Sequence, residues 1–177
     1  TLMHLLNRLY DLPPENGRIT IGGVDITDMK GSWVRSHIGM VLQEPFLFSR
    51  TIAENIGITR RNMELSDIRC AASIACVDDA ITEFTNGYDT VVGERGVTLS
   101  GGQKQRTAMA RMLTQRTPIR IFDDSLSAVD AETDARIRQA LKKNLKVSTV
   151  ILISHRVTTL MQAECILVLD KGRIAEM

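Results

Sequence analysis

The sequence predicts an α/β fold with a mainly parallel core sheet and an inserted α-helical subdomain. The strand candidates are short and β-branched, and helix-like stretches separate them, which is typical of parallel sheets with crossover helices. One helical block, from about residue 66 to 115, interrupts this alternation. The chain has 177 residues, of which 44% are hydrophobic and 24% are charged. That length is enough to bury a core.

The first part of the chain predicts a helix, a hairpin and a strand. An amphipathic pattern opens the chain, at Leu2, Leu5, Leu6 and Leu9. Residues 18–27 alternate apolar and polar side chains around Gly22–Gly23, as in a β-hairpin. The mostly apolar run from Ile38 to Gln43 predicts a short strand.

Two helices are predicted in the central block. The first has apolar residues in near-helical register from Ser66 to about Gly87. The second begins just after Ser100-Gly101-Gly102 and runs through Met112-Leu113.

Three further strand candidates follow, at 119–122, 149–153 and 166–169. A helix lies between the first two, and Asp130 can cap its start. Acidic residues suit its N-terminal end and basic residues its C-terminal end: Glu132, Asp134, Lys142, Lys143 and Lys146. Its predicted buried stripe is Ile137, Leu141 and Leu145.

Composition excludes several classes of partner and site. A net charge of +1 gives no general attraction to nucleic acid, so any anion site must be local. Cys70, Cys76 and Cys165 lack the spacing of a zinc site. No apolar run reaches the roughly 18 residues that a membrane-spanning helix needs.

Paired acids end one of the apolar runs, in "IRIFDDSLSAVD". A carboxylate at the carboxyl end of a buried parallel strand lies where α/β proteins bind ligands. In P-loop nucleotide hydrolases one such Asp, here Asp123, helps to hold Mg²⁺, and the next acid, here Asp124, can position the attacking water. The pattern alone also describes a strand end with capping acids.

The segment "VTLSGGQKQRTAMAR" predicts a phosphate site. Ser100, Gly101 and Gly102 directly precede a helix, where free N–H groups and the helix dipole attract an anion. A flexible Gly-Gly turn would explain these three residues. It would not explain the helix behind them, which carries Arg106 and Arg111.

"LSGGQ", followed by "IFDDSLSAVD" and "ILISHR", resembles the ATP-binding-cassette (ABC) ATPases over the whole chain, 1–177. The resemblance implies a P-loop NTPase-like fold that binds ATP and Mg²⁺. It further implies a RecA-like core, at 1–50 and 116–177, and a helical signature subdomain at about 51–115.

The resemblance also implies residue roles. The signature motif spans Leu99–Gln103 and would bind ATP through Ser100, Gly101, Gly102 and Gln103. Residues 127–130 match the D-loop of the family, and Asp130 in it would face both the nucleotide and a partner domain.

The predicted catalytic residues are Asp124, His155 and Gln43. Asp123 is the Walker B aspartate, a Mg²⁺ ligand together with Gln43. His155 is the switch histidine at the γ-phosphate.

Two segments resemble exporter-type cassettes: 43–56 and the "GERG" segment with Glu94. Both would contact transmembrane domains, which places the domain at the cytoplasmic face of a membrane. Phe46, Leu47 and Phe48 would be a docking surface, or a hydrophobic anchor for their loop.

Three features depart from the family pattern. The chain contains no G-x-x-x-x-G-K-[ST] phosphate loop. Thr1 would directly follow that loop, so the chain is expected to be an internal fragment that binds ATP poorly alone.

Asp124 stands where the family usually has Glu, which favours a degenerate site in a heterodimer of unlike nucleotide-binding domains over a homodimer. Arg120 interrupts an apolar strand; it would reach an edge or pair with an acid.

Two other hypotheses about the function remain open. One is a soluble non-transport ABC ATPase acting in translation or DNA repair; the exporter-like segments and the balanced charge argue against it. The other is a non-catalytic structural module, which the missing phosphate loop favours.

Overall fold

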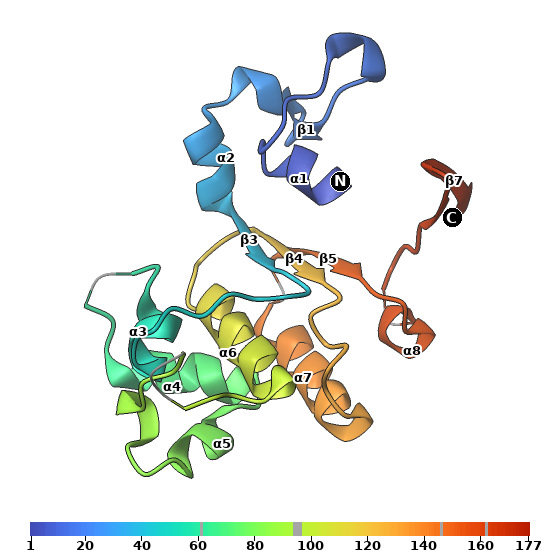
Figure 1. Ribbon diagram of the computed structural model, residues 1–177. Helices are drawn as coiled ribbons and strands as arrows, with labels where there is room; N and C mark the ends of the chain where they lie inside the picture. Colours follow the sequence, from blue (N-terminus) through green and yellow to red (C-terminus); the bar gives the residue numbers. More distant parts are fainter. Residues whose placement is uncertain (61, 94–96, 146, 162) are drawn as a thin grey trace.

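A parallel sheet of three strands lies at the centre of the structure (Figure 1). Its order is β3-β4-β5, with bounds Ile38–Val41, Ile119–Asp123 and Thr149–Ile153. This computed structural model describes residues 1–60, 62–93, 97–145, 147–161 and 163–177. The prediction of an α/β fold with a parallel core sheet is confirmed.

Side chains alternate between the two faces of this sheet, as the period of a strand requires. In β4, Ile121 packs with Val34 and Ile38 on one face, whereas Phe122 joins Val41 in the larger core on the other face. Ile121 and Phe122 are both buried. Because both faces are covered, this strand is almost continuously apolar.

The N-terminal segment packs on the first face. It contains α1 (Leu2–Leu6), η1 (Pro14–Asn16), β1 (Thr20–Ile21), β2 (Val24–Asp25), η2 (Ile26–Asp28) and α2 (Gly31–His37). The hairpin β1-β2 turns at Gly22–Gly23 as predicted. The opening helix is shorter than its leucine pattern, because Arg8 adopts a left-handed backbone with φ of 51°. Leu9 therefore lies outside α1 and is exposed.

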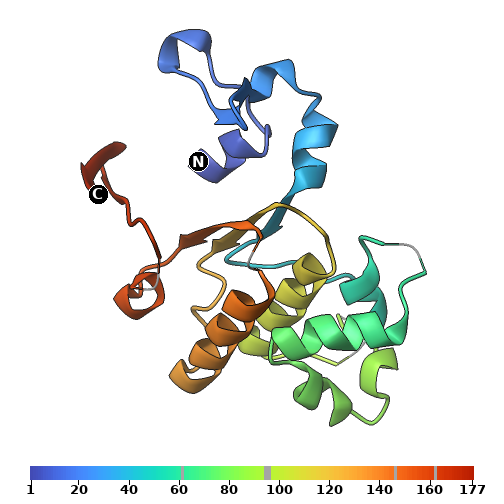
Figure 2. The ribbon, with the colours of Figure 1, turned by 180° about the vertical axis from the view of Figure 1, so that it is seen from behind.

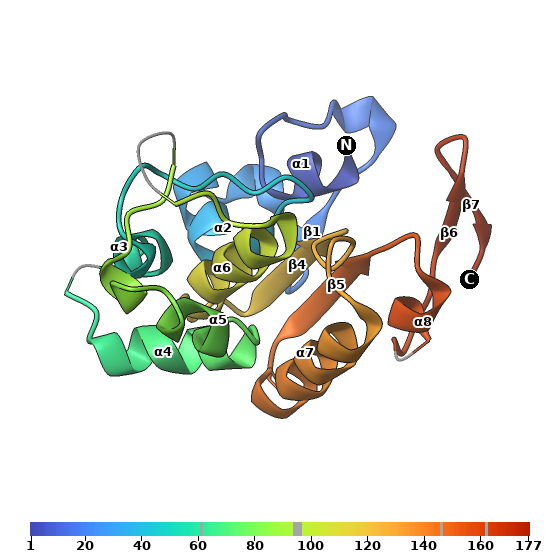
Figure 3. The same cartoon turned by 60° about the horizontal axis from the view of Figure 1, so that its bottom comes forward.

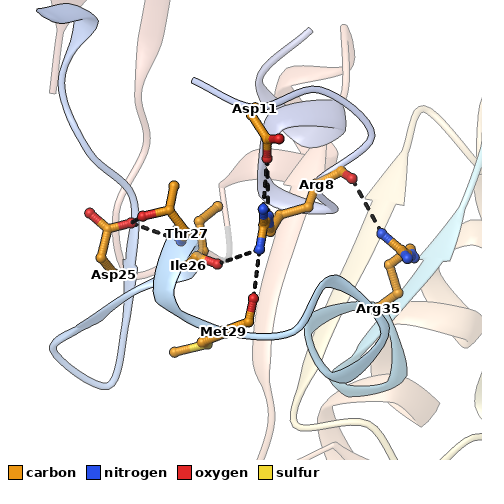
Figure 4. Close-up of polar contacts among 7 residues, drawn as sticks. All are labelled: Arg8, Asp11, Asp25, Ile26, Thr27, Met29 and Arg35. Atoms are coloured by element: carbon orange, nitrogen blue, oxygen red, sulfur yellow. Dashed lines mark hydrogen bonds and ion pairs between the residues drawn. The ribbon is translucent and has the colours of Figure 1, made fainter. Parts of the chain in front are cut away.

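Arg8 ties this segment together (Figure 4). Its guanidinium donates to the carbonyl oxygens of Ile26 at 3.1 Å and Met29 at 2.6 Å, and it pairs with Asp11 at 2.9 Å. Arg35 of α2 donates to the carbonyl oxygen of Arg8 at 3.3 Å. These bonds hold the turn before α2 against the chain that leaves α1.

Helices cover the other face (Figure 3). They are α3 (Ile52–Gly57), α4 (Leu65–Ile74), α5 (Asp78–Thr82), η3 (Gly87–Asp89), α6 (Gly101–Leu113) and α7 (Ala131–Asn144). The helix predicted from Ser66 to about Gly87 is divided into α4 and α5, because Cys76 between them has φ of 53°. Helix α6 ends at Leu113 as predicted, but it begins at Gly101, so both glycines lie inside its first turn. Among the described residues, no helix is long and apolar enough to cross a bilayer.

Gly39 allows α6 to approach the sheet closely. A Cβ at this position would lie 2.8 Å from Thr117 Oγ1 and 3.0 Å from Met112 Cγ. Since contacts below about 3 Å force neighbouring atoms to move, a larger residue would push the end of α6 away from β3.

The amphipathic features of α7 follow the prediction. Ile137, Leu141 and Leu145 are buried, and Lys142 and Lys143 lie in the last turn. Asp134 is buried and pairs with Arg138 at 3.1 Å. Lys146 lies outside the described residues.

The C-terminal strands do not join the core sheet (Figure 2). After α8 (Val157–Leu160), β6 (Val168–Asp170) and β7 (Arg173–Glu176) form an antiparallel hairpin. The strand predicted at 166–169 thus begins later, at Val168, and it pairs with β7. Lys171 and Gly172 have φ of 47° and 78°, which is typical of a two-residue hairpin turn.

Arg120 does not find an acid among the described residues. Its guanidinium donates to the carbonyl oxygens of Thr117 at 3.3 Å and Gln115 at 3.1 Å. Burial lowers the pKa of Arg120. The charge in β4 is therefore satisfied by the backbone of the turn that leads into the strand.

Asp78 connects three parts of the helical block. Nε and Nη2 of Arg69 in α4 each donate to its carboxylate at 3.1 Å, and the hydroxyl of Tyr88 in η3 donates at 2.6 Å. The hydrogen bond from Arg69, and then that from Tyr88, lowers the pKa of Asp78.

Changing Asp78 to Asn should lower the free energy of unfolding by about 1 kcal/mol at neutral pH, because charge-assisted hydrogen bonds are lost. A lowered folded-state pKa means that ionised Asp78 stabilises the protein above the unfolded pKa of about 3.9, and that this contribution disappears as pH falls through the folded value. Urea unfolding at neutral pH and at about pH 3 should therefore show a difference that shrinks on acidification. The exposed neighbour Asp79, changed to Asn, is the control. A difference that is constant with pH would contradict the assignment.

Candidate functional site

Four predicted site residues lie at the carboxyl ends of the parallel strands. Asp123 ends β4 and Asp124 follows it, while Gln43 lies just beyond β3 and His155 just beyond β5. Asp123 is paired with Ile153, so the ends of β4 and β5 are level. The structure thus brings these four residues to one edge of the sheet, where α/β proteins bind ligands.

Among the described residues, the carboxylates of Asp123 and Asp124 take part in no ion pair. The ion pairs among the described residues involve other acids: Asp11, Asp78 and Asp134. Asp123 and Asp124 are both half-buried. Mg²⁺ is usually held by one or two carboxylates together with phosphate oxygens and water. The oxygen donors of Asp123 and Gln43 fit that pattern.

Within the described ranges, no group of three or more His, Cys, Asp or Glu side chains could hold a metal ion. Protein side chains alone therefore do not form a closed metal site at this edge.

The backbone of Asp124 is fixed in an unusual conformation. Its φ is 43°, a left-handed value that Asp tolerates better than most non-glycine residues. The N–H of Asp124 donates to the carbonyl oxygen of Ile153 at 2.8 Å, and its own carbonyl oxygen accepts from Ser127 N–H at 3.2 Å. Because the N–H and the carbonyl of Asp124 are both hydrogen-bonded, the backbone from which this carboxylate extends is held in place.

The predicted phosphate turn begins α6 with a capping box. The Ser100 hydroxyl oxygen accepts from Gln103 N–H at 3.2 Å, and Gln103 Oε1 accepts from Ser100 N–H at 2.9 Å. The N–H groups of Gly101 and Gly102 belong to the first turn and have no intrahelical partner. Capping uses a lone pair of the Ser100 hydroxyl, so its proton remains available to an anion.

Gly102 has a structural role in addition to its expected approach to phosphate. A Cβ at Gly102 would lie 2.9 Å from the carbonyl oxygen of Ala128. The signature turn of α6 is therefore packed against the segment 127–130, which we call the D-loop.

Both ends of the D-loop are fixed by hydrogen bonds. Asp130 caps α7, as predicted, by accepting from Thr133 N–H at 2.9 Å, and this bond lowers the pKa of Asp130. Arg156 donates to the carbonyl oxygens of Ser127 at 2.8 Å and Val129 at 3.1 Å.

Arg156 and Gln105 were not among the predicted site residues. Gln105 of α6 hydrogen-bonds both the D-loop and the carbonyl oxygen of Gln43. The only sequence signal was proximity, since Gln105 follows the signature motif and Arg156 follows His155. Backbone partners such as theirs leave no pattern in a sequence.

The loop after Gln43 is anchored from α6. Arg111 donates to the carbonyl oxygens of Phe46 at 2.9 Å and Asn55 at 2.7 Å, and it lies 5.7 Å from the centre of the Phe48 ring. Leu47 packs against the larger core, whereas Phe46 and Phe48 are 67% and 41% exposed. Leu47 is thus an anchor, and docking by the two aromatic rings stays a prediction.

Among the described residues, Thr1 makes no hydrogen bond to the edge of the sheet. Thr1 precedes α1 and makes no side-chain capping bond. Among the described residues, its recorded backbone bonds run to His4 and Leu5. Glu94 lies outside the described residues.

Known proteins resemble this chain along its whole length. The family described as "ABC transporter" matches residues 1–127. ABC transporter B family member 1 of Dictyostelium discoideum is 44% identical over 100% of this chain and 19% of its own length. The Beta-(1-->2)glucan export ATP-binding/permease protein NdvA of Rhizobium meliloti (strain 1021) is 41% identical over 100% of this chain and 30% of its own.

A solved structure, of a bacterial Atm1-family ABC exporter with ATP bound, superposes with a TM-score of 0.93 at 42% identity. It covers 99% of this chain, which corresponds to 30% of that exporter. The chain therefore spans less than a third of the length of these relatives. Because the family match spans residues 1–127 and relatives are more than 40% identical along the chain, the chain belongs to the ABC transporter family.

Proposed function

We propose that the chain is part of the nucleotide-binding domain of an ABC exporter, which couples ATP binding and hydrolysis to transport across a membrane. One observation carries this proposal: Gln43, Asp123, Asp124 and His155 meet at one sheet edge, and the signature turn packs on the adjoining D-loop. The relatives' names, which include export and ATP-binding functions, support it.

Within this proposal, Asp123 and Gln43 hold Mg²⁺ together with the phosphates of ATP. Mg²⁺ supplies positive charge that stabilises the charge developing on the transferred phosphoryl group. His155 binds the γ-phosphate, and Gln43 also orients the attacking water. Thr1 lies beside the phosphates at the start of α1, where helix N–H groups favour an anion.

Asp124 is the residue that positions water for attack, and it does so poorly. Its carboxylate extends one methylene less than that of the Glu usual in the family. Because its backbone is held by Ile153 and Ser127, the chain cannot move forward to compensate. We therefore assign a degenerate ATP site to this domain.

The partner of this domain is a second nucleotide-binding domain, and an unlike one. The signature residues Ser100, Gly101, Gly102 and Gln103 bind the ATP held by that partner. Asp130 and the rest of the D-loop face it. The intact capping box of α6 supports this role, because it presents free N–H groups and one hydroxyl proton.

The transmembrane domains contact the segment 43–56 and the region of Glu94. The exposed rings of Phe46 and Phe48, held on a loop fixed by Arg111, support this assignment. The domain would then lie at the cytoplasmic face of the membrane. Residues 1–50 and 116–177 form its core, and 51–115 its helical subdomain. A soluble non-transport ABC ATPase would leave these two exposed rings without transmembrane domains to contact.

In the full-length exporter, changing Asp124 to Glu should raise ATP hydrolysis at its own site by about 10- to 100-fold, because the carboxylate then reaches the attacking water. Hydrolysis is measured by phosphate release after the partner site's catalytic carboxylate has been neutralised. Asp124→Asn is the matched control and should not raise the rate. Equal rates for Asp124→Glu and the parent would show that reach does not limit this site.

Changing Ser100 to Asp should lower turnover at the partner's ATP site by at least about tenfold, since a carboxylate repels the phosphates. Asp still caps a helix, so the melting temperature should hold. Turnover of the assembled pair is the measurement, and Ser66→Asp, at the exposed start of α4, is the control. Full activity of Ser100→Asp would argue against a signature that acts across the interface.

A further inference from the structure

Gln105 is a buried polar side chain in the middle of α6, 6% exposed. Nε2 of Gln105 donates to the carbonyl oxygen of Gln43 at 3.1 Å and to the Ser127 hydroxyl at 3.3 Å. Oε1 accepts from Ala128 N–H at 3.2 Å. One amide therefore joins the loop after β3 to the D-loop.

The orientation of this amide follows from its backbone partners. A carbonyl oxygen can only accept and an N–H can only donate, so Nε2 must face Gln43 and Oε1 must face Ala128. Burying an amide is costly unless it is hydrogen-bonded, and an apolar residue would fill the same position in a helix at lower cost. The polar group is thus explained by the connection it makes.

The D-loop has little freedom to move independently of Gln105. Arg156 holds the carbonyl oxygens on either side of Ala128, and the carbonyl oxygen of Ala128 lies against Gly102. A displacement of the loop after β3 would be transmitted through the Gln105 amide to the D-loop, because the amide is bonded to the backbone of both segments.

We propose that Gln105 is a positioning residue that couples the Gln43 loop to the D-loop within one subunit. When the Gln43 loop moves to meet ATP and Mg²⁺, Gln105 moves the D-loop toward the partner with it. Binding of ATP at one site thereby changes the position of the D-loop at the other site. This inference rests on the proposed function, since it requires two ATP sites in an assembled pair.

Two variants separate the two connections. Gln105→Glu keeps the acceptor for Ala128 N–H but replaces the donor to Gln43 by a carboxylate oxygen. Gln105→Leu removes both bonds at similar volume. The control is Gln139→Glu, which makes the same chemical change on the exposed side of α7.

The full-length exporter, in lipid nanodiscs, is tested with Mg-ATP. Both Gln105 variants should lower kcat about tenfold, as the loss of a positioning hydrogen bond would, and leave KM for ATP within about twofold. Hydrogen exchange at the Ala128 amide should accelerate in Gln105→Leu and stay unchanged in Gln105→Glu. Gln139→Glu should match the parent in both measurements.

A kcat within about twofold of the parent in both folded variants would overturn the coupling. A rise in KM at unchanged kcat would also overturn it, because that result assigns Gln105 to nucleotide binding. If instead the parent itself hydrolyses no ATP while exchange at Ala128 follows the expected pattern, the proposed function fails and the Gln105 connection remains.

Discussion

The parallel pairing of β4 with β3 and β5 is the constraint on which the rest of the structure depends. Because the strands run in one direction with level ends, Gln43, Asp123, Asp124 and His155 leave the sheet at one edge. β4 can hold this central position because both of its faces are buried, by α1 and α2 on one side and by α6 and α7 on the other. Packing in the two cores thus determines where the acids lie.

Sequence patterns predicted the parts of the fold that depend on local chemistry. Asp130 caps α7 as predicted, because a short carboxylate directly before a helix can accept from an N–H of the first turn. The sequence predictions were wrong or incomplete where the backbone conformation is unusual, or where a side chain bonds to a residue far away in the sequence. The left-handed Cys76 divides a helical pattern. The partners of Arg156, and two of the three partners of Gln105, are backbone atoms that carry no side-chain signal.

Two residues of the site combine structural and chemical duties in different ways. Ser100 accepts a hydrogen bond as a helix cap and still has a proton to donate, so the two roles are compatible. The backbone N–H and carbonyl of Asp124 are both hydrogen-bonded, so the Cα from which the side chain extends is held in place. The carboxylate then reaches one methylene less far than that of a Glu at the same position. The intact capping box of the signature turn and the shorter side chain of Asp124 are together the reason for our proposal that the assembled pair has unequal ATP sites.

The central claim is that this sheet edge holds Mg-ATP and that the signature turn serves the opposite subunit. A cryo-electron microscopy structure of the full-length protein with ATP and Mg²⁺ tests it most directly. We expect nucleotide phosphates to lie at Asp123, Gln43 and His155 of this chain. We also expect Ser100 of this chain to contact the γ-phosphate of the ATP that its partner holds. Nucleotide bound away from the sheet edge, or a signature turn that contacts no phosphate in the closed pair, would contradict the account.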